Sequence, residues 1–159
     1  MRLDNNGKLK VKALRLFILT FSFIFISTSL WAELNRDSSG VVSDNQTGLA
    51  WQDYYGENVA DIQKSSWQDA LIYCKELSLG NNSDWRLPNI KELRTIVDRK
   101  KYSPSIRLGF ENIVADGYWS STTDVSFNSY AWGDNFDKGD DYWEDKTKES
   151  YVRCVRGGR

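Results

Sequence analysis

Apolar positions recur every three or four residues between residues 66 and 80, which is the spacing of one face of an α-helix. The members of this apolar face are Trp67, Ala70, Leu71, Cys74 and Leu77. Ser66 can cap the N-terminus of the helix, and Asp69 completes a weak capping box. Gly80 is placed to end it. The pattern predicts one amphipathic helix with Cys74 on its buried face.

A second helix start follows the string Asp84–Leu93, "DWRLPNIKEL". Pro88 disfavours the helical region for the residue before it, so the chain is expected to turn there. Asn89 then caps the helix and Glu92, three residues later, can reach back to complete a capping box. We interpret Trp85 as a large apolar plug beside the turn, and Arg86 as a partner of backbone carbonyls or of a carboxylate.

The remaining apolar segments alternate with polar turns, as strands do. Residues 41–53 predict two short strands around a turn, and residues 54–64 predict a loop. From Tyr118 onward the chain is rich in aromatic and β-branched residues, with a hairpin tip predicted at 138–140. The last segment, 151–156, alternates so that Cys154 can face the first helix. The order of strand, two helices and further strands predicts an α+β domain.

The N-terminus has a different pattern and is interpreted as a signal peptide, residues 1–32. A basic lead precedes an apolar run at 16–27, which is too short to span a bilayer comfortably. An uncleaved anchor helix is the alternative. We expect a short linker at 33–40 and one domain at 41–158, exported to the periplasm or secreted.

Composition narrows the range of functions for the exported part. Without residues 1–32 the chain keeps 16 basic and 21 acidic residues, which argues against a nucleic-acid partner and against attraction to anionic lipid. The sequence has no histidine, which removes Ser-His-Asp and Cys-His catalysis and most zinc sites. Cys74 and Cys154 are expected to form one disulfide in an oxidising compartment, a free catalytic or metal-binding thiol being the alternative.

An acidic and aromatic segment, Trp132–Asp145, is the main candidate for a binding site. Its carboxylates are the hard oxygen ligands that calcium prefers, although their spacing differs from an EF-hand. The alternative is a solvated acidic hairpin whose charges keep an edge strand from pairing. The candidate metal ligands are Asp134, Asp137, Asp140 and Asp141.

Aromatic side chains in and before this segment, Tyr130 among them, could stack on sugar rings or anchor a protein partner, while at least half of them are expected to fill the core instead. The candidate ligand-binding residues are Tyr118, Trp119, Trp132, Asn135, Tyr142 and Trp143. Neighbours in a strand point to opposite faces, so one member of each adjacent pair must leave the core side or enter a second layer. The basic segment at 99–101 is expected to be a solvated helix end, with an anionic ligand as the alternative.

Several short strings occur in the order seen in a known bacterial family: "TGLAW", "ALIYC", "WRLPNIKEL", "YWSST" and "VRCVRGG". On these strings the chain resembles the exported domain of unknown function named after the C-terminal domain of the Legionella collagen-like adhesin. The resemblance covers residues 41–158 and implies a C-type-lectin-like fold, related to formylglycine-generating enzymes.

The implied fold packs two helices on short antiparallel sheets, brings the N- and C-terminal strands close together, and ties the first helix to the last strand by a disulfide. That tie fits Cys74 and Cys154. The second disulfide and the sugar motif of lectins are missing, and Trp132–Asn135 matches the lectin string Trp-Asn-Asp only loosely.

Together these observations predict an exported, non-enzymatic binding or adhesion module that recognises a glycan or a protein at the cell envelope. No membrane insertion is expected after signal cleavage, and no cofactor other than a possible calcium ion. The alternatives are a relative of the formylglycine-generating enzymes, which would need a free thiol, and a structural envelope protein that associates with itself.

Overall fold

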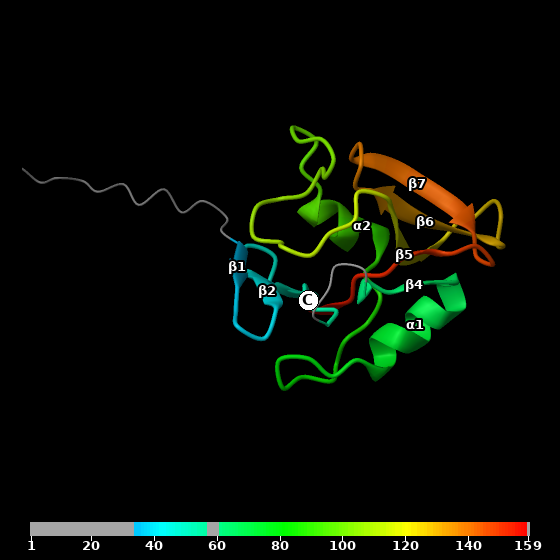
Figure 1. Ribbon diagram of the computed structural model, residues 1–159. Helices are drawn as coiled ribbons and strands as arrows, with labels where there is room; N and C mark the ends of the chain where they lie inside the picture. Colours follow the sequence, from blue (N-terminus) through cyan, green and yellow to red (C-terminus); the bar gives the residue numbers. More distant parts are fainter. Residues whose placement is uncertain (1–33, 57–60, 159) are drawn as a thin grey trace, which may run out of the picture.

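The computed structural model describes residues 34–56 and 61–158. It shows an α+β domain with two short helices and two mostly antiparallel sheets, as the sequence predicts (Figure 1). The predicted signal peptide, residues 1–32, lies outside the described residues. The elements are β1 (Leu34–Arg36), β2 (Val41–Asp44), β3 (Leu49–Gln52), β4 (Lys64–Ser65), α1 (Trp67–Glu76), α2 (Ile90–Leu93), the 3₁₀ turn η2 (Arg94–Ile96), β5 (Gly117–Thr123), β6 (Tyr130–Asn135), β7 (Asp140–Asp145), β8 (Ser150–Tyr151) and β9 (Val155–Gly157).

Two sheets share the core. One has the strand order β1-β2-β3-β9 and the other has the order β4-β8-β5-β6-β7. All pairs are antiparallel except β5 with β8, where Tyr118 stands opposite Tyr151. In Figure 1, β1 and β2 lie at one end of the molecule, β6 and β7 lie at the other, and α2 lies between them. The first and last strands occupy the two edges of one sheet.

The segment expected to be a linker, 33–40, carries a strand instead. Leu34 and Arg36 in β1 pair with Asp44 and Val42 in β2. Leu34 is buried, and Arg36 is held by the carboxylate of Asp53 at 2.7 Å. A segment of three strand residues has too little alternation to be recognised in sequence, which is why it was expected to be a linker.

The last segment, 151–156, is not one strand as expected. Tyr151 ends β8 in one sheet and Val155 begins β9 in the other. Between them the chain crosses from sheet to sheet, and Val152 donates its N–H to Gln63 while the carbonyl of Cys154 accepts from Gln52. The alternation still puts Val152 and Cys154 in one core cluster, as predicted.

The cap of α1 is the predicted one, because the hydroxyl of Ser66 accepts a hydrogen bond from the N–H of Asp69. The predicted end at Gly80 is wrong, since the helix stops at Glu76. Gly80 instead has a φ of +60° in a turn that pairs Leu79 with Asn82. A left-handed turn of this kind favours glycine as strongly as a helix end does, so the residue type alone could not separate the two.

The helix start at α2 is confirmed in detail. Asn89 accepts from the N–H of Glu92, and the Glu92 carboxylate accepts from the N–H of Asn89. Trp85 is buried, and its indole N–H donates to the carbonyls of Leu79 and Asn82. Arg86 makes two hydrogen bonds of 2.7 Å to Glu92. The stretch is therefore scaffold that turns the chain into α2.

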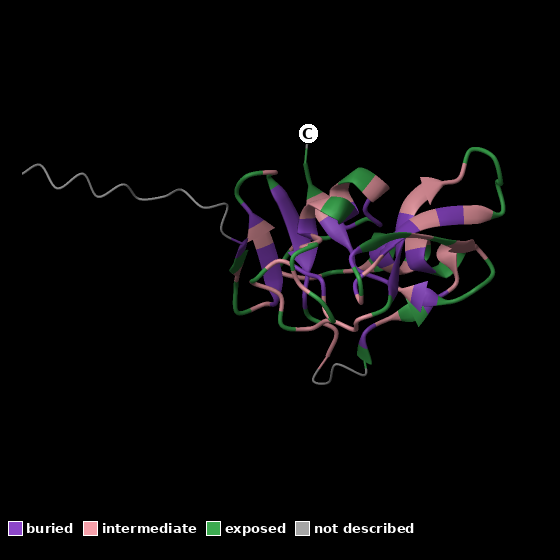
Figure 2. Ribbon diagram, turned by 90° about the horizontal axis from the view of Figure 1, so that it is seen from above, coloured by how far each residue is buried: buried purple, intermediate pink, exposed green. Residues whose placement is uncertain are grey.

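Two hydrophobic clusters lie on the opposite faces of β5. Tyr118 lies in the cluster that contains Leu93 and Ile96 of α2 and η2. The next residue, Trp119, lies in the cluster that contains Cys74 of α1. Strand β5 is thus enclosed between α1 and α2, while β7 at the edge of the sheet carries no buried residue. Buried residues lie mainly in the strands, and exposed ones gather in turns and loops (Figure 2).

The predicted disulfide is present. Cys74 of α1 is bonded to Cys154, with the two Cα atoms 5.4 Å apart. It fastens the helix to the crossing between the two sheets, and it closes a loop of 80 residues. In the chain-entropy view a closure of this length is worth about 4 kcal/mol.

A buried ion pair joins the same crossing to the rest of the domain. Arg153 and Asp53 are both fully buried, and their side chains meet at 3.0 Å. Arg153 also donates to the carbonyls of Gln52 and Asn112. The Asp53 carboxylate accepts further bonds from Arg36 and from the N–H groups of Glu111 and Asn112. The Asp53 carboxylate is therefore well satisfied, whereas the Nε of Arg153 has no hydrogen-bond partner among the described residues.

Candidate ligand-binding face

The hairpin of β6 and β7, with the loop before it, carries a row of exposed and half-buried aromatic rings. Trp132 stands directly opposite Trp143, and side chains of opposed residues share one face of a sheet. The Tyr130 ring lies 5.0 Å from the Trp143 ring and 6.2 Å from that of Phe127, measured between centroids. We call these four residues, Phe127, Tyr130, Trp132 and Trp143, the aromatic face.

This surface is accessible. Trp143 is 51% exposed and Phe127 is 60% exposed, while Tyr130 and Trp132 are half-buried. Exposed rings of this size, lying in contact, present an apolar platform that water hydrates poorly. Trp132 and Trp143 were predicted as ligand-binding residues, and the structure brings them together. The sequence also suggested that Tyr130 could stack on a ligand, but Phe127 was missed because it lies in a polar loop.

Two of the predicted ligand residues belong to the core instead. Tyr118 and Trp119 are both 0% exposed. The Tyr118 hydroxyl accepts from the N–H of Val114, and the Trp119 indole donates to the carbonyl of Ser65. Tyr118 and Trp119 point to opposite faces of β5, and both rings are buried because helices cover both faces of this strand. Neither ring is placed to contact a ligand.

Two further predicted residues, Asn135 and Tyr142, point away from the aromatic face. Tyr142 stands opposite Gly133 on the other side of the sheet, and its hydroxyl lies 2.8 Å from that of Ser150. The side-chain oxygen of Asn135 accepts from the N–H of Asp137 and so holds the hairpin turn. These residues support the hairpin rather than its exposed surface.

Polar groups border the aromatic face near α2. Asp141 binds Arg94 at 3.0 Å and Arg99 at 3.2 Å. Arg99 also donates to the carbonyl of Gly139 at the hairpin tip. The basic segment is expected to be solvated, and the side chain of Arg99 is 64% exposed. Arg99 also joins that segment to the hairpin.

Asp134 follows Trp132 by two residues in β6, so both side chains lie on the same face of the hairpin, and it stands opposite Asp141 of β7. It is 0% exposed, and neither of its oxygens has a hydrogen-bond partner among the described residues. Burial raises the pKa of Asp134 to about 6, from a usual value near 3.8. Arg94 and Arg99 act against this rise in pKa, and the carboxylate of Asp141 acts with it.

The predicted calcium site is not assembled. Within residues 34–56 and 61–158, no three acidic, cysteine or histidine side chains gather in a way that could hold a metal ion. Asp134 and Asp141 lie opposite each other, but Asp141 is already paired with two arginines. Asp137 belongs to the hairpin turn, and Asp140 is exposed at the start of β7. A hairpin separates these carboxylates by alternating them between its two faces.

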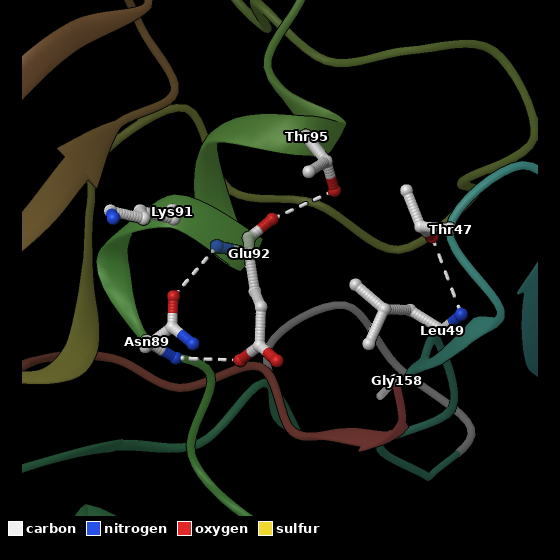
Figure 3. A pocket seen from close by; sticks show the side chains of 7 residues that line it. All are labelled: Thr47, Leu49, Asn89, Lys91, Glu92, Thr95 and Gly158. Carbon is white, nitrogen blue, oxygen red and sulfur yellow. Dashed lines mark hydrogen bonds between the residues drawn. The ribbon is translucent and has the colours of Figure 1, made fainter.

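A shallow pocket lies elsewhere, between α2 and the turn that joins β2 to β3 (Figure 3). It has a volume of about 290 Å³ and is lined by Thr47, Leu49, Asn89, Lys91, Glu92, Thr95 and Gly158. Burial alone would raise the pKa of Glu92, but hydrogen bonds from Arg86 and Asn89 outweigh it, so the pKa is lowered. The Glu92 carboxylate, Asn89 and the Thr95 hydroxyl already make hydrogen bonds within the fold. The polar groups of this pocket therefore serve mainly to stabilise α2.

Fold and site together define a disulfide-linked α+β domain that displays an aromatic face on one hairpin. The sequence model of the family described as the Lcl C-terminal domain matches residues 40–156, and the chain belongs to this family. The comparison with curated proteins found no match. Among the described residues, no helix is long and apolar enough to cross a membrane.

Proposed function

We propose that this chain is an exported, non-enzymatic binding module whose aromatic face recognises a glycan at the cell envelope. The observation that carries the proposal is the contact of the half-buried ring of Tyr130 with the exposed ring of Trp143, next to Trp132. A pyranose ring presents a flat array of C–H groups, which pack against exposed indole and phenol rings. Membership of the Lcl C-terminal domain family supports a module of the adhesin type.

Three further observations support the export and binding parts of the proposal. The disulfide is of the kind that persists in oxidising compartments, in line with the predicted signal peptide. Both cysteines of the chain are used in it, which leaves no thiol for chemistry of the formylglycine-generating type. The lectin-like fold and the periplasmic or secreted location remain part of this proposal.

The test is a broad glycan array probed with the full chain, expressed with its own N-terminus and purified from the exported fraction. The array is run with calcium and again with chelator. Since no acidic cluster for a metal is formed by the described residues, binding is expected to persist with chelator. Loss of binding with chelator would contradict a metal-independent aromatic platform.

Matched variants connect the array signal to the surface. Trp143→Ala removes an exposed ring and should abolish or strongly weaken binding while the melting temperature changes little. Tyr102→Ala is the control, because Tyr102 is 69% exposed but is not part of the aromatic face. Equal loss in both variants, or in neither, would overturn the assignment of this face.

A protein partner is the second candidate, and one observation favours it. Val125 is 95% exposed on the loop that leads to Phe127, so an apolar tip extends the aromatic face. Absence of any glycan binding, together with loss of envelope-protein capture by Val125→Asp but not by Tyr102→Ala, would favour this candidate. Self-association would appear as a concentration-dependent mass in sedimentation.

A further inference from the structure

A buried carboxylate without a partner lies at the inner end of the aromatic face. Asp134 follows Trp132 by two residues in β6, so both side chains lie on the same face of the sheet. Of the buried side-chain oxygens and nitrogens described in β6 and β7, only the two oxygens of Asp134 have no hydrogen-bond partner among the described residues. An ionised carboxylate in this position is costly unless donors reach it.

The two arginines that act electrostatically on this carboxylate are weakly held by other groups. Arg94 and Arg99 lie near Asp134, but both bind Asp141 on the next strand. The side chain of Arg94 is 38% exposed and that of Asp141 is 50% exposed. Ion pairs this exposed contribute little free energy, so opening the pair is cheap compared with leaving a buried charge without donors.

We propose that Asp134 is the hydrogen-bond acceptor for a neutral sugar with adjacent hydroxyl groups, bound at the inner end of the aromatic face. This inference rests on the proposed glycan-binding function and deepens it. Arg94 swings away from Asp141, two sugar hydroxyls donate to Asp134, and the sugar ring lies against Trp132.

The charges of the site select a neutral ligand. Two guanidinium groups, of Arg94 and Arg99, stand against two carboxylates, of Asp134 and Asp141, so the site has no excess charge for an ionic ligand to neutralise. A hydroxyl group donates and accepts at once. Adjacent hydroxyls can therefore donate to Asp134 while accepting from the released arginine, which no simple anion or cation can do.

The test compares Asp134→Asn with the wild-type chain on neutral monosaccharides and oligosaccharides, with sulfated and carboxylated glycans as a second set. The amide keeps the shape but loses the charged acceptor, and binding of neutral sugars should weaken about tenfold or more. Asp140→Asn is the matched control, an exposed acid of the same hairpin, and it should bind as the wild type does. The melting temperature of Asp134→Asn, expected at or above that of the wild type, shows that the variant is folded.

The outcomes separate this inference from the function on which it rests. Neutral-sugar binding that Trp143→Ala removes but Asp134→Asn keeps would overturn the inference and leave the glycan-binding function standing. Binding confined to sulfated or carboxylated glycans would overturn the choice of ligand. A wild-type chain that binds no glycan would overturn both.

Discussion

Two aspartates, Asp53 and Asp134, are equally buried but differ in whether the fold supplies hydrogen bonds to their carboxylates. Asp53 accepts hydrogen bonds from Arg36, Arg153 and two backbone N–H groups. Asp134 accepts none from the described residues, and its nearest cations are engaged by Asp141. Both side chains are 0% exposed.

This difference shows which of the two buried charges stabilises the fold. Asp53, which follows β3, joins β1, the segment at 111–112 and the crossing that contains Arg153, so its partners come from three distant parts of the chain. Asp134 joins nothing, and it lies beside the exposed aromatic face. A buried charge that costs stability and contributes no contact is typical of a functional position rather than a structural one.

The largest expected effect tests the structural charge. Asp53→Asn should destabilise the domain by about 3–5 kcal/mol at pH 7, because Arg153 is left as a buried charge without its carboxylate. Chemical denaturation monitored by tryptophan fluorescence measures the loss. Asp140→Asn, an exposed acid, should change stability by less than about 0.5 kcal/mol. A loss below about 1 kcal/mol for Asp53→Asn would remove the contrast between the two aspartates.

The next effect is the pH dependence that Asp134 imposes. Its pKa is raised to about 6 in the folded protein against about 3.8 when exposed, so the folded state binds the extra proton between these values. Stability from this group is therefore complete below about pH 4 and is lost as the pH rises through about 6. The difference corresponds to up to about 3 kcal/mol. It is measured as the change with pH in the stability of the wild type relative to Asp134→Asn. A difference that stays constant from pH 4 to pH 7 would show that Asp134 is not perturbed.

A smaller effect distinguishes the two aspartates at a single pH. Asp134→Asn should stabilise the domain at pH 7 by about 2 kcal/mol, since it removes the desolvated charge but leaves a buried amide with unmet hydrogen bonds. The same substitution at Asp53 destabilises. Calorimetric melting of both variants tests the opposite signs. Destabilisation by Asp134→Asn would mean that the carboxylate supports the fold after all.

Local signals made part of this fold predictable. The caps at Ser66 and Asn89 depend on residues three positions apart, and the burial of Trp85 follows from its place beside the turn. The disulfide followed from the count of cysteines and the expected compartment. Each of these depends on a few neighbouring residues or on the composition, which the sequence displays directly.

Burial of charge was not predictable by the same means. The alternation of 151–156 placed Arg153 opposite Cys154, but only the crossing between two sheets encloses both faces of that segment. For Asp134, the sequence showed one acid among several, and the register that sets it opposite Asp141 is a long-range property. The aromatic face was predicted only in part, through Trp132 and Trp143. The rest could not be predicted, because the exposure of a ring depends on which helix covers which face of the sheet.

The smallest effect concerns Arg94, which pairs with Asp141 and acts electrostatically on Asp134. Arg94→Gln breaks an exposed ion pair with Asp141 and should cost less than about 1 kcal/mol at pH 7. Because Arg94 lowers the pKa of Asp134, its removal should also move the pH midpoint of the stability change above 6. The pH profile of Arg94→Gln against the wild type measures this shift, and the double variant Arg94→Gln with Asp134→Asn should lack it. A shift that survives in the double variant would come from Asp141 instead, and Arg94 would then have no influence on the pKa of Asp134.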